Sequence, residues 1–384
     1  MQEPKRDTIP LSVADTLGAV FQERVKRTPH ATAYIQFDET TQQWRETTWQ
    51  QMALDLAQWQ AAFRREQLNQ GDRVAIMLRN SREWVLFDLA AQTLGLVTVP
   101  LYTNDRPENI GYILQDAGVR LLLLEGNEQW QALQLIRNQL AGLSRIVTLE
   151  PVDPMGLQPR LRHIDAWLPD NYDKQLQVLD IASKSLASIV YTSGTTGRSK
   201  GVMLSHHNIL WNIEAGLQLI KVYPSDRFLS FLPLSHTLER TVGYYMPIVV
   251  GASVAYARSI PQLAEDLLSI RPTMLIAVPR IFERVYSRIQ EKLQQDSSLA
   301  RKLFHIAVET GWLKFEHQQG RTPWSARLTL WPLLQKLVAS KIQNKLGGRL
   351  RIAVSGGAPL SPDIAKVFIG LGVPILQGYG LTET

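Results

Sequence analysis

A loop rich in glycine and hydroxyl groups carries the strongest chemical signal in this sequence. It consists of Tyr191-Thr192-Ser193-Gly194-Thr195-Thr196-Gly197-Arg198-Ser199-Lys200-Gly201, with apolar runs before and after it. Glycines let the backbone approach a ligand closely and point N–H groups at an anion, and the hydroxyl groups add further donors. Lys200 supplies a compact positive charge. The pattern predicts a tight loop between two strands that binds a polyphosphate.

The glycine spacing excludes a Walker A loop, which needs G-x-x-x-x-G-K-S/T at the start of a helix. Here Gly194 and Gly197 are three residues apart, and Gly201 follows the lysine. A flexible surface hairpin is the alternative, because linkers also combine glycine with hydroxyl residues. Linkers are seldom framed by two buried strands, which favours phosphate binding.

The loop resembles the signature loop of the adenylate-forming superfamily, which includes the acyl-CoA synthetases. The sequence departs from the family pattern at Ser199, where a proline is usual, and this departure is expected to loosen the loop without removing a donor. The resemblance implies that the loop holds the β- and γ-phosphates of ATP. The residues assigned in this way are Thr192, Ser193, Gly194, Thr195, Thr196, Gly197 and Lys200.

Three further segments resemble later motifs of the same superfamily, in the family's order. They are Leu232-Pro233-Leu234-Ser235-His236-Thr237-Leu238-Glu239-Arg240, Ser355-Gly356-Gly357-Ala358-Pro359-Leu360 and Gln377-Gly378-Tyr379-Gly380-Leu381-Thr382-Glu383-Thr384. The first, together with residues 278–284, is most similar to the long-chain fatty acyl branch. With four motifs in order, the chain is identified as a member of this superfamily by resemblance.

The resemblance assigns nucleotide-binding and catalytic roles to these motifs. The nucleotide would also contact Gly356, Gly357, Ala358, Pro359, Gln377, Gly378, Tyr379, Gly380 and Thr382. Tyr379 would stack on adenine, and Thr382 would bond the α-phosphate. Thr195 and Glu383 would hold Mg²⁺. The catalytic group would comprise Lys200, His236, Thr382 and Glu383.

His236 and several other residues are candidates for binding the acyl substrate. By resemblance this histidine positions the carboxylate or the acyl phosphate; without the resemblance, a lone histidine is more often structural. Some fatty-acid members carry a gating tryptophan four residues beyond it, but Arg240 stands here, so that gate is not transferred. A last group either lines an acyl tunnel or packs in an ordinary core, with the core favoured: Trp211, Tyr244, Tyr245 and Met246.

The implied reaction is the activation of a long-chain fatty acid by ATP. Acyl-adenylate and pyrophosphate form first, and the thiol of coenzyme A then displaces AMP to give acyl-CoA. A carboxylate is already a nucleophile, so no Ser/His/Asp triad is needed, and none is recognisable. Two alternatives stay open: an acyl-AMP ligase that passes the acyl group to a carrier protein, and a nucleotide- or lipid-binding module without turnover.

Strand and helix patterns alternate along the chain. Apolar runs between residues 71 and 149 alternate with helices that begin at Ser81 and Pro107, and strand patterns return at 186–191, 201–204, 228–232, 274–278 and 350–354. Such alternation is typical of βαβ units and a parallel sheet. We expect an α/β fold, a large N-terminal body of acyl-CoA synthetase type with two parallel-rich sheets flanked by helices. Its expected subdomains are 1–180 and 181–384, with 150–180 as a surface connection.

The composition narrows the class of protein. The 384 residues include no cysteine, which excludes disulfides, thiolate nucleophiles and zinc–cysteine sites. No apolar segment follows the mixed-charge N-terminus, so a signal peptide is not expected. The uncharged run from Thr241 to Ala257 contains two glycines and a proline, and we interpret it as buried strand and turn. A cytoplasmic location is expected.

The net charge of +6 is concentrated in one segment. Residues 280–351 carry 14 basic and 5 acidic side chains, a local charge of +9, and include a helical pattern at 330–346. One interpretation is an ordinary helix with a solvated basic face. The other is peripheral contact with an anionic membrane, at the inner membrane face. Nucleic-acid binding is not expected, because no recognition motif accompanies the charge.

The last residues are of turn type and carry hydroxyl groups. The family's later motifs, with the hinge and the lid domain that carries a catalytic lysine, would lie beyond Thr384. We therefore expect an incomplete form that binds ATP weakly and turns over poorly.

Overall fold

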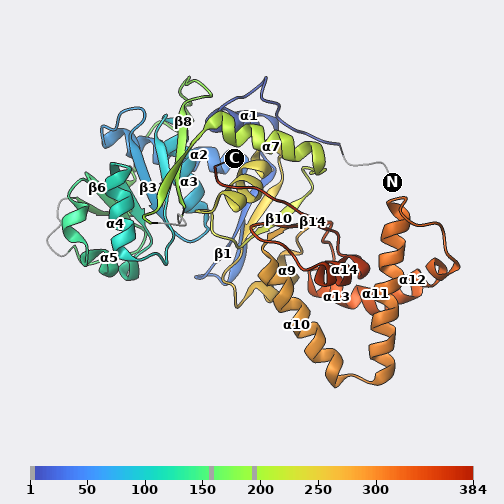
Figure 1. Ribbon diagram of the computed structural model, residues 1–384. Coiled ribbons are helices and arrows are strands. Elements are labelled where there is room, and N and C mark those ends of the chain that lie inside the picture. Colours follow the sequence, from blue (N-terminus) through green and yellow to red (C-terminus); the bar gives the residue numbers. More distant parts are fainter. Residues whose placement is uncertain (1–4, 155–159, 193–196, 384) are drawn as a thin grey trace. The chain divides into compact units, whose positions relative to one another are not determined.

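A computed structural model describes residues 5–154, 160–192 and 197–383 (Figure 1). The chain divides into two compact units. Unit 1 comprises residues 1–225, 233–256 and 382–384, and unit 2 comprises residues 226–232 and 257–381. The site residues expected from the sequence are distributed over both units.

Unit 1 contains a seven-stranded sheet in the order β7-β6-β5-β3-β4-β8-β9. Its strands are β3 (Arg73–Met77), β4 (Val97–Pro100), β5 (Val119–Leu124), β6 (Arg145–Thr148), β7 (Leu161–His163), β8 (Leu186–Thr192) and β9 (Lys200–Ser205). Neighbouring strands are parallel, except that β8 and β9 are antiparallel. The central strands are buried on both faces, which explains why they are continuous apolar runs.

Helices cover this sheet, and two begin where the sequence predicts. The helices of unit 1 up to residue 219 are α1 (Leu17–Arg27), α2 (Trp49–Arg65), α3 (Arg82–Thr93), α4 (Pro107–Asp116), α5 (Asn127–Gln134), η1 (Arg137–Leu140), α6 (Ile164–Trp167) and α7 (His206–Leu219). The hydroxyl group of Ser81 caps α3 by accepting from the N–H of Trp84 at 3.2 Å. Pro107 occupies the first turn of α4, where its missing N–H costs no hydrogen bond.

A second group of strands in unit 1 runs in the order β11-β1-β2. Strand β11 (Ser253–Tyr256) is parallel to β1 (Thr32–Asp38), and β2 (Gln43–Thr48) is antiparallel to β1. The prediction of strand and turn for 241–257 is wrong over most of its length. A π-helix η2 (Glu239–Tyr245) and α8 (Met246–Val250) precede β11. Tertiary hydrogen bonds of Arg240, Tyr244 and Tyr245 favour the helix over the local strand propensity.

Unit 2 contains four parallel strands in the order β14-β13-β12-β10. They are β10 (Arg227–Ser230), β12 (Met274–Ala277), β13 (Ile352–Ser355) and β14 (Ile375–Gln377). Its helices are α9 (Leu263–Ile270), α10 (Pro279–Gln295), α11 (Ser298–Gln318), η3 (Ala326–Leu330), α12 (Trp331–Leu334), η4 (Gln335–Ala339), α13 (Ser340–Lys345) and α14 (Pro362–Gly370). The helical pattern predicted at 330–346 is confirmed, because α12, η4 and α13 follow one another from Trp331 to Lys345.

The α/β class with two parallel-rich sheets flanked by helices is confirmed. Two details differ from the expectation. Residues 150–180 contain β7 and α6, and β7 pairs with β6 at the sheet edge. Strands β8 and β9 belong to unit 1, so the units do not divide at residue 180. Within the described residues, no helix combines the length and apolarity that a membrane span requires.

Candidate functional site

The predicted phosphate loop joins two paired strands of unit 1. Strands β8 and β9 form an antiparallel hairpin in which Thr192 pairs with Lys200, as a loop between two strands requires. Four predicted ATP ligands, Ser193, Gly194, Thr195 and Thr196, lie outside the described residues. Gly197 and Lys200 are exposed at the described end of the loop. The loop therefore extends from the carboxyl end of β8, the edge at which open α/β sheets bind ligands.

The described part of the loop is held by α4 and not by a proline. Ser199 donates a hydrogen bond from Oγ to Oδ1 of Asn109 at 3.1 Å. The guanidinium of Arg198 lies over the ring of Tyr112, with 5.3 Å between Cζ and the ring centroid. Ser199 occupies the position where the family usually has proline, so its side chain supplies a tether that differs from proline's fixed backbone. Arg198 is occupied by this stacking contact, whereas Lys200 extends into solvent.

His236 lies in a turn that is fixed by backbone hydrogen bonds. The N–H of Leu234 donates to Oδ1 of Asn80 at 2.9 Å, and the N–H of His236 donates to the carbonyl of Pro233 at 2.9 Å. The N–H of Leu238 donates to Nδ1 of His236 at 3.2 Å, which leaves the proton of the neutral ring on Nε2. Desolvation by the surrounding protein lowers the pKa of His236, although its side chain is partly exposed. At neutral pH this histidine is therefore an uncharged hydrogen-bond donor.

The hydroxyl groups of Thr237 and Thr382 lie 3.3 Å apart. These residues are 145 positions apart in sequence, and both belong to unit 1. The contact brings the predicted α-phosphate ligand Thr382 next to the turn that carries His236. Glu383, the predicted metal ligand, follows with its side chain exposed. The structure thus places three of the predicted site residues, His236, Thr382 and Glu383, on one part of unit 1.

In unit 2, the two predicted adenine motifs follow adjacent parallel strands. Ser355 at the end of β13 pairs with Gln377 at the end of β14. The N–H of Gly378 donates to the carbonyl of Ser355 at 2.9 Å, and the N–H of Gly356 donates to the carbonyl of Ala277 at 3.1 Å. Gly357 has a φ of 79°, a left-handed conformation that favours glycine. The two motifs therefore lie side by side at the carboxyl edge of these strands.

The side chains at this edge are open to a ligand. Tyr379 is 93% exposed, and Gly357, Ala358, Pro359, Gln377 and Gly380 are also exposed. The amide of Gln377 donates to the carbonyl of Leu360 at 3.5 Å. Ser355 contributes a buried hydroxyl oxygen with no hydrogen-bond partner among the described residues. Ser355 is therefore a further candidate, and its place at a strand end within the motif at 355–360 is the sequence signal for it.

Arg240 is explained by the interior of unit 1. Its guanidinium donates to Oδ1 of Asp88 and Oγ1 of Thr98, both at 2.5 Å, and to Oγ of Ser188 at 2.6 Å. The residue is therefore a buried structural cation and not a gate. Tyr244, Tyr245 and Met246 are buried, as the core interpretation predicts, whereas Trp211 is exposed on α7 and belongs to no core.

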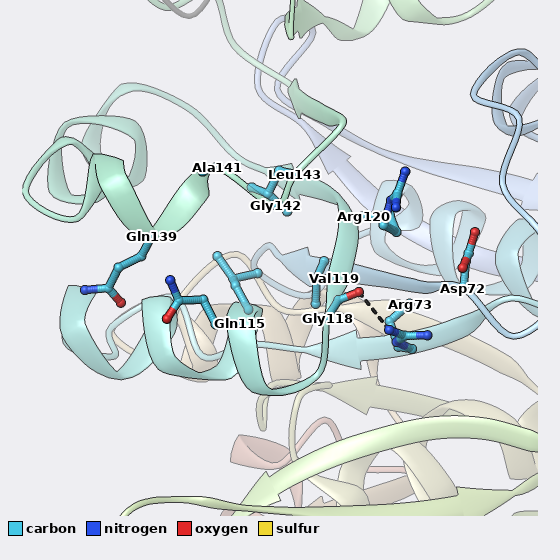
Figure 2. Close-up of a pocket in the computed structure, with 11 residues that line it drawn as sticks. Asp72, Arg73, Gln115, Gly118, Val119, Arg120, Gln139, Ala141, Gly142 and Leu143 are labelled. Carbon is cyan, nitrogen blue, oxygen red and sulfur yellow. Dashed lines mark hydrogen bonds between the residues drawn. The ribbon is translucent and has the colours of Figure 1, made fainter.

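A cavity of about 510 Å³ lies at the amino ends of strands β3 and β5 in the unit 1 sheet, opposite the ends that carry the predicted loop (Figure 2). Its lining includes Asp72, Arg73 and Arg120, which stand where β3 and β5 begin. The guanidinium of Arg73 donates to the carbonyls of Ala117 and Gly118, at 2.5 and 3.1 Å, and so holds the preceding turn. None of the predicted site residues lines this cavity, so it is not the predicted nucleotide site.

Comparison with known proteins establishes the family. The sequence pattern of AMP-binding enzymes matches residues 21–384. This chain belongs to the AMP-binding enzyme family. The superfamily predicted from the four motifs is therefore confirmed.

Two curated relatives of this chain have similar names. Long chain acyl-CoA synthetase 7, peroxisomal, of Arabidopsis thaliana is 32% identical over 83% of this chain and 45% of its own length. The long-chain-fatty-acid–CoA ligase FadD15 of Mycobacterium bovis is 30% identical over 82% of this chain and 52% of its own length. The chain thus spans about half the length of the curated relatives it matches.

A solved structure supports the fold. The anthranilate CoA ligase AuaEII, crystallised in complex with anthranoyl-AMP, matches with a TM-score of 0.70. The match covers 96% of this chain and 59% of the ligase, at 20% sequence identity. At this identity the likeness establishes the fold of this chain and not its substrate.

The acidic residues present suit a metal ion that is shared with a nucleotide. Among the described residues, no group of three or more His, Asp or Glu side chains is placed to hold an ion by itself. The exposed carboxylate of Glu383 is a hard oxygen donor, and Mg²⁺ is usually held by one or two carboxylates together with phosphates and water. Glu383 therefore fits a Mg²⁺ that arrives with ATP.

Proposed function

We propose that this chain binds ATP and a long-chain fatty acid and forms acyl-adenylate, from which coenzyme A takes the acyl group, with the weak ATP binding and the slow turnover expected from the sequence. The observation that carries the proposal is the family match over residues 21–384, combined with motifs at the carboxyl ends of β8, β13 and β14. The names of the curated relatives support a long-chain fatty acid as substrate. Because the chain spans about half of those relatives, the activity of the whole protein is part of the proposal.

The nucleotide would be bound by three sets of groups. The loop residues 192–197 and Lys200 would bind the β- and γ-phosphates through N–H groups, hydroxyls and one ammonium. Tyr379 would stack on the adenine, and its exposed ring is available for that contact. The backbone of 356–359 and 377–380 would border the adenine and ribose. In the free protein these polar groups are exposed on glycine-rich turns and stay hydrated, so they need no protein partner. They are therefore available to a ligand, which supports this assignment.

Formation of acyl-adenylate requires in-line attack and neutralisation of the phosphate charges, and it requires no nucleophile from the protein. A carboxylate oxygen of the fatty acid would attack the α-phosphorus, and the bond from that phosphorus to the pyrophosphate oxygen would break. Neutral His236 would donate from Nε2 to the carboxylate or to the acyl phosphate and orient it. Thr382 would donate its hydroxyl to the α-phosphate. Lys200 would stabilise the charge on the departing pyrophosphate.

Mg²⁺ would be held by Glu383 and Thr195, and when bound it supplies charge neutralisation at the phosphates. In the second half-reaction the thiol of coenzyme A would lose its proton to solvent, and its sulfur would attack the acyl carbon and form the thioester. The bond from the acyl carbon to the phosphate oxygen would break, and AMP would leave with its electrons. ATP, Mg²⁺ and coenzyme A are therefore the small molecules that this proposal requires.

Product analysis with and without coenzyme A tests the proposal. Pyrophosphate release is measured with ATP, Mg²⁺ and fatty acids of increasing chain length, and acyl-CoA is measured by its thioester. The proposal expects fatty-acid-dependent pyrophosphate and a thioester only when coenzyme A is present. Acyl-adenylate that accumulates and passes only to a carrier protein would favour the acyl-AMP ligase. Nucleotide binding without pyrophosphate release would favour the non-catalytic module.

We also propose that the protein is cytoplasmic and contacts the inner face of the membrane peripherally, through residues 280–351. The local charge of +9 supports attraction to anionic lipid. A long-chain fatty acid partitions into membranes, so a ligase at the membrane surface would meet its substrate there.

A further inference from the structure

Four large apolar side chains of unit 2 are exposed within a short stretch of chain. Trp324, Leu330, Leu333 and Leu337 are 63%, 49%, 58% and 44% exposed. The three leucines are spaced three and four residues apart on consecutive helical turns, η3, α12 and η4, so they share one face. Scattered exposed apolar residues are ordinary, but a helical face that presents three leucines to water calls for a partner.

The opposite face of the same helical turns already forms a core. Trp331, Leu334 and Ala339 are buried, and Trp331 and Ala339 belong to a cluster with Phe304 and Leu371. In Figure 1, α12 lies beside α11, which carries Phe304. The segment is therefore packed in unit 2 through its buried face, and the exposed leucines are not needed for that packing.

Every Lys, Arg, Asp or Glu in the segment that carries the exposed leucines is basic. Residues 317–362 contain no Asp or Glu and seven Lys or Arg. Arg321, Arg327, Lys336 and Lys341 are exposed, and none of the four forms an ion pair with a described residue. A helical segment that exposes three leucines, carries cations without an ion pair among the described residues and contains no carboxylate complements a surface that is apolar inside and anionic at its rim.

We propose that residues 321–341 form a docking surface for an anionic lipid bilayer. In this arrangement Leu330, Leu333 and Leu337 enter the boundary between headgroups and acyl chains, Trp324 lies at headgroup level, and the four cations contact lipid phosphates. The inference rests on the proposed membrane contact of residues 280–351 and narrows it to one helical face. It assigns no docking role to α10, whose basic residues alternate with acidic ones at Glu283 and Glu291.

Other occupants of this face fit the observations less well. A nucleic acid would use the cations, but exposed leucines add little to base stacking. A protein partner or a second copy would bury the leucines, yet the complete absence of carboxylates over 317–362 favours a partner that is anionic across its whole surface.

Vesicle binding by the whole chain tests the inference. Co-sedimentation is measured with vesicles of phosphatidylcholine alone and of equal parts phosphatidylcholine and phosphatidylglycerol. Two triple variants are compared with the unaltered chain: Leu330→Gln, Leu333→Gln and Leu337→Gln together, and Arg327→Gln, Lys336→Gln and Lys341→Gln together. The matched apolar control is Leu135→Gln with Leu219→Gln, two strongly exposed leucines of unit 1. The matched charge control replaces the exposed Arg137, Lys174 and Lys184 with Gln.

We expect preferential binding to the anionic vesicles. Removing three cations should lower the affinity for anionic vesicles by about a hundredfold, because each charge near an anionic surface contributes roughly fivefold. Replacing the three leucines should lower it by roughly tenfold or more, since each buried methylene contributes, and neither control should change it. Fluorescence adds an independent readout, because a blue shift on vesicle addition should be smaller in Trp324→Phe. Thermal unfolding verifies that each variant folds. If the triple leucine variant does not fold, the single variant Leu333→Gln is measured in its place.

Three results would overturn the inference. They are equal binding to neutral and anionic vesicles, equal losses in the control variants, and leucine-dependent self-association or protein binding without vesicle binding. Pyrophosphate release without vesicles is measured on the same variants. It reports on the proposed ligase activity separately, so failure of one proposal does not imply failure of the other.

Discussion

Arg240 and Asp88 form an ion pair in the interior of unit 1, with 2.5 Å between Nη2 of the arginine and Oδ1 of the aspartate. Their side chains are 3% and 0% exposed. The other carboxylate oxygen accepts hydrogen bonds from the hydroxyls of Tyr244 and Tyr245, at 3.0 and 2.7 Å. Burial alone would lower the pKa of Arg240, but the charge of Asp88 raises it, so the guanidinium stays charged. The pair ties η2 to α3 and so fixes the helix that follows His236.

Replacing Asp88 with Asn should be strongly destabilising. The change leaves a buried guanidinium without a counter-charge, for which we expect a loss of about 3–5 kcal/mol in the free energy of unfolding. Urea denaturation followed by tryptophan fluorescence measures this loss. Arg45→Gln is the control, because Arg45 pairs with Asp38 while its own side chain is 63% exposed, and it should change the stability little. Similar effects of the two substitutions would contradict a structural role of the buried pair.

His206 should make the fold sensitive to acid. Its ring is fully buried, Nδ1 accepts from the N–H of Leu17 at 3.2 Å, and Nε2 has no hydrogen-bond partner among the described residues. Burial lowers the pKa of His206 from its ordinary 6.5 to about 4, although Asp88 and Asp15 oppose the shift. Between these pH values the unfolded chain binds a proton that the folded chain does not, so stability falls as the pH falls from 6.5 to 4.

The variant His206→Asn tests this linkage, since the amide oxygen keeps an acceptor for the N–H of Leu17. From pH 7 to pH 4.5 the histidine should contribute a loss of about 2.5 kcal/mol in the free energy of unfolding. Urea denaturation at both pH values measures the difference, and the variant should lose that much less than the unaltered chain. Equal losses in the two proteins would assign the acid sensitivity to other groups.

The strand positions could be predicted because parallel strands are buried on both faces and form uninterrupted apolar runs, as in β5. The adjacency of the motifs after β13 and β14 also follows from the pattern, because parallel neighbours end at one edge. The helix η2 could not be predicted. Its tyrosines favour a strand locally, and the hydrogen bonds that hold them come from Asp88, more than 150 residues away.

The candidate site shows the same division. Lys200 and Tyr379 could be proposed as site residues from their motifs, because local turn chemistry is visible in the sequence, and their roles stay predictions. The contact between Thr237 and Thr382 could not, because it depends on tertiary packing across 145 positions. The hydrogen bond from Ser199, the residue that departs from the family pattern, to Asn109 on α4 could not be predicted for the same reason.

Gly311→Ala should disrupt the packing of α11 on α14. A Cβ atom at this position would lie 1.8 Å from the carbonyl oxygen of Gly370, which is backbone and cannot move alone. Overpacking of this kind costs about 1–3 kcal/mol or more, and we expect the upper end. Gly216→Ala in α7 is the helical control, because its Cβ would meet only the flexible end of Met246, at 3.3 Å. Thermal unfolding should show a lower Tm for the first variant and an unchanged or higher Tm for the second.

Tyr379→Ala should weaken nucleotide binding without loss of stability. The ring is 93% exposed, so its removal costs the free protein no core contact. Loss of stacking on a base is worth about 1–3 kcal/mol, or roughly five- to 150-fold in affinity. Calorimetric titration with ATP measures the change. Leu381→Ala, an exposed apolar residue two positions further, is the control; an equal loss there would mean that the segment acts through its conformation and not through the ring.

Lys200→Gln should lower ATP affinity more than Arg198→Gln, although both substitutions remove one positive charge from the same loop. Arg198 lies over the ring of Tyr112, whereas Lys200 is exposed at the start of β9 beside Thr192. A charge-assisted hydrogen bond to phosphate is worth about 1.5–3 kcal/mol, so Lys200→Gln should cost roughly tenfold to 150-fold. Titration with ATP and with AMP separates the effects, because a contact to the β- or γ-phosphate should leave AMP affinity unchanged. Equal losses for both variants and both nucleotides would mean that the loop acts only through its overall charge.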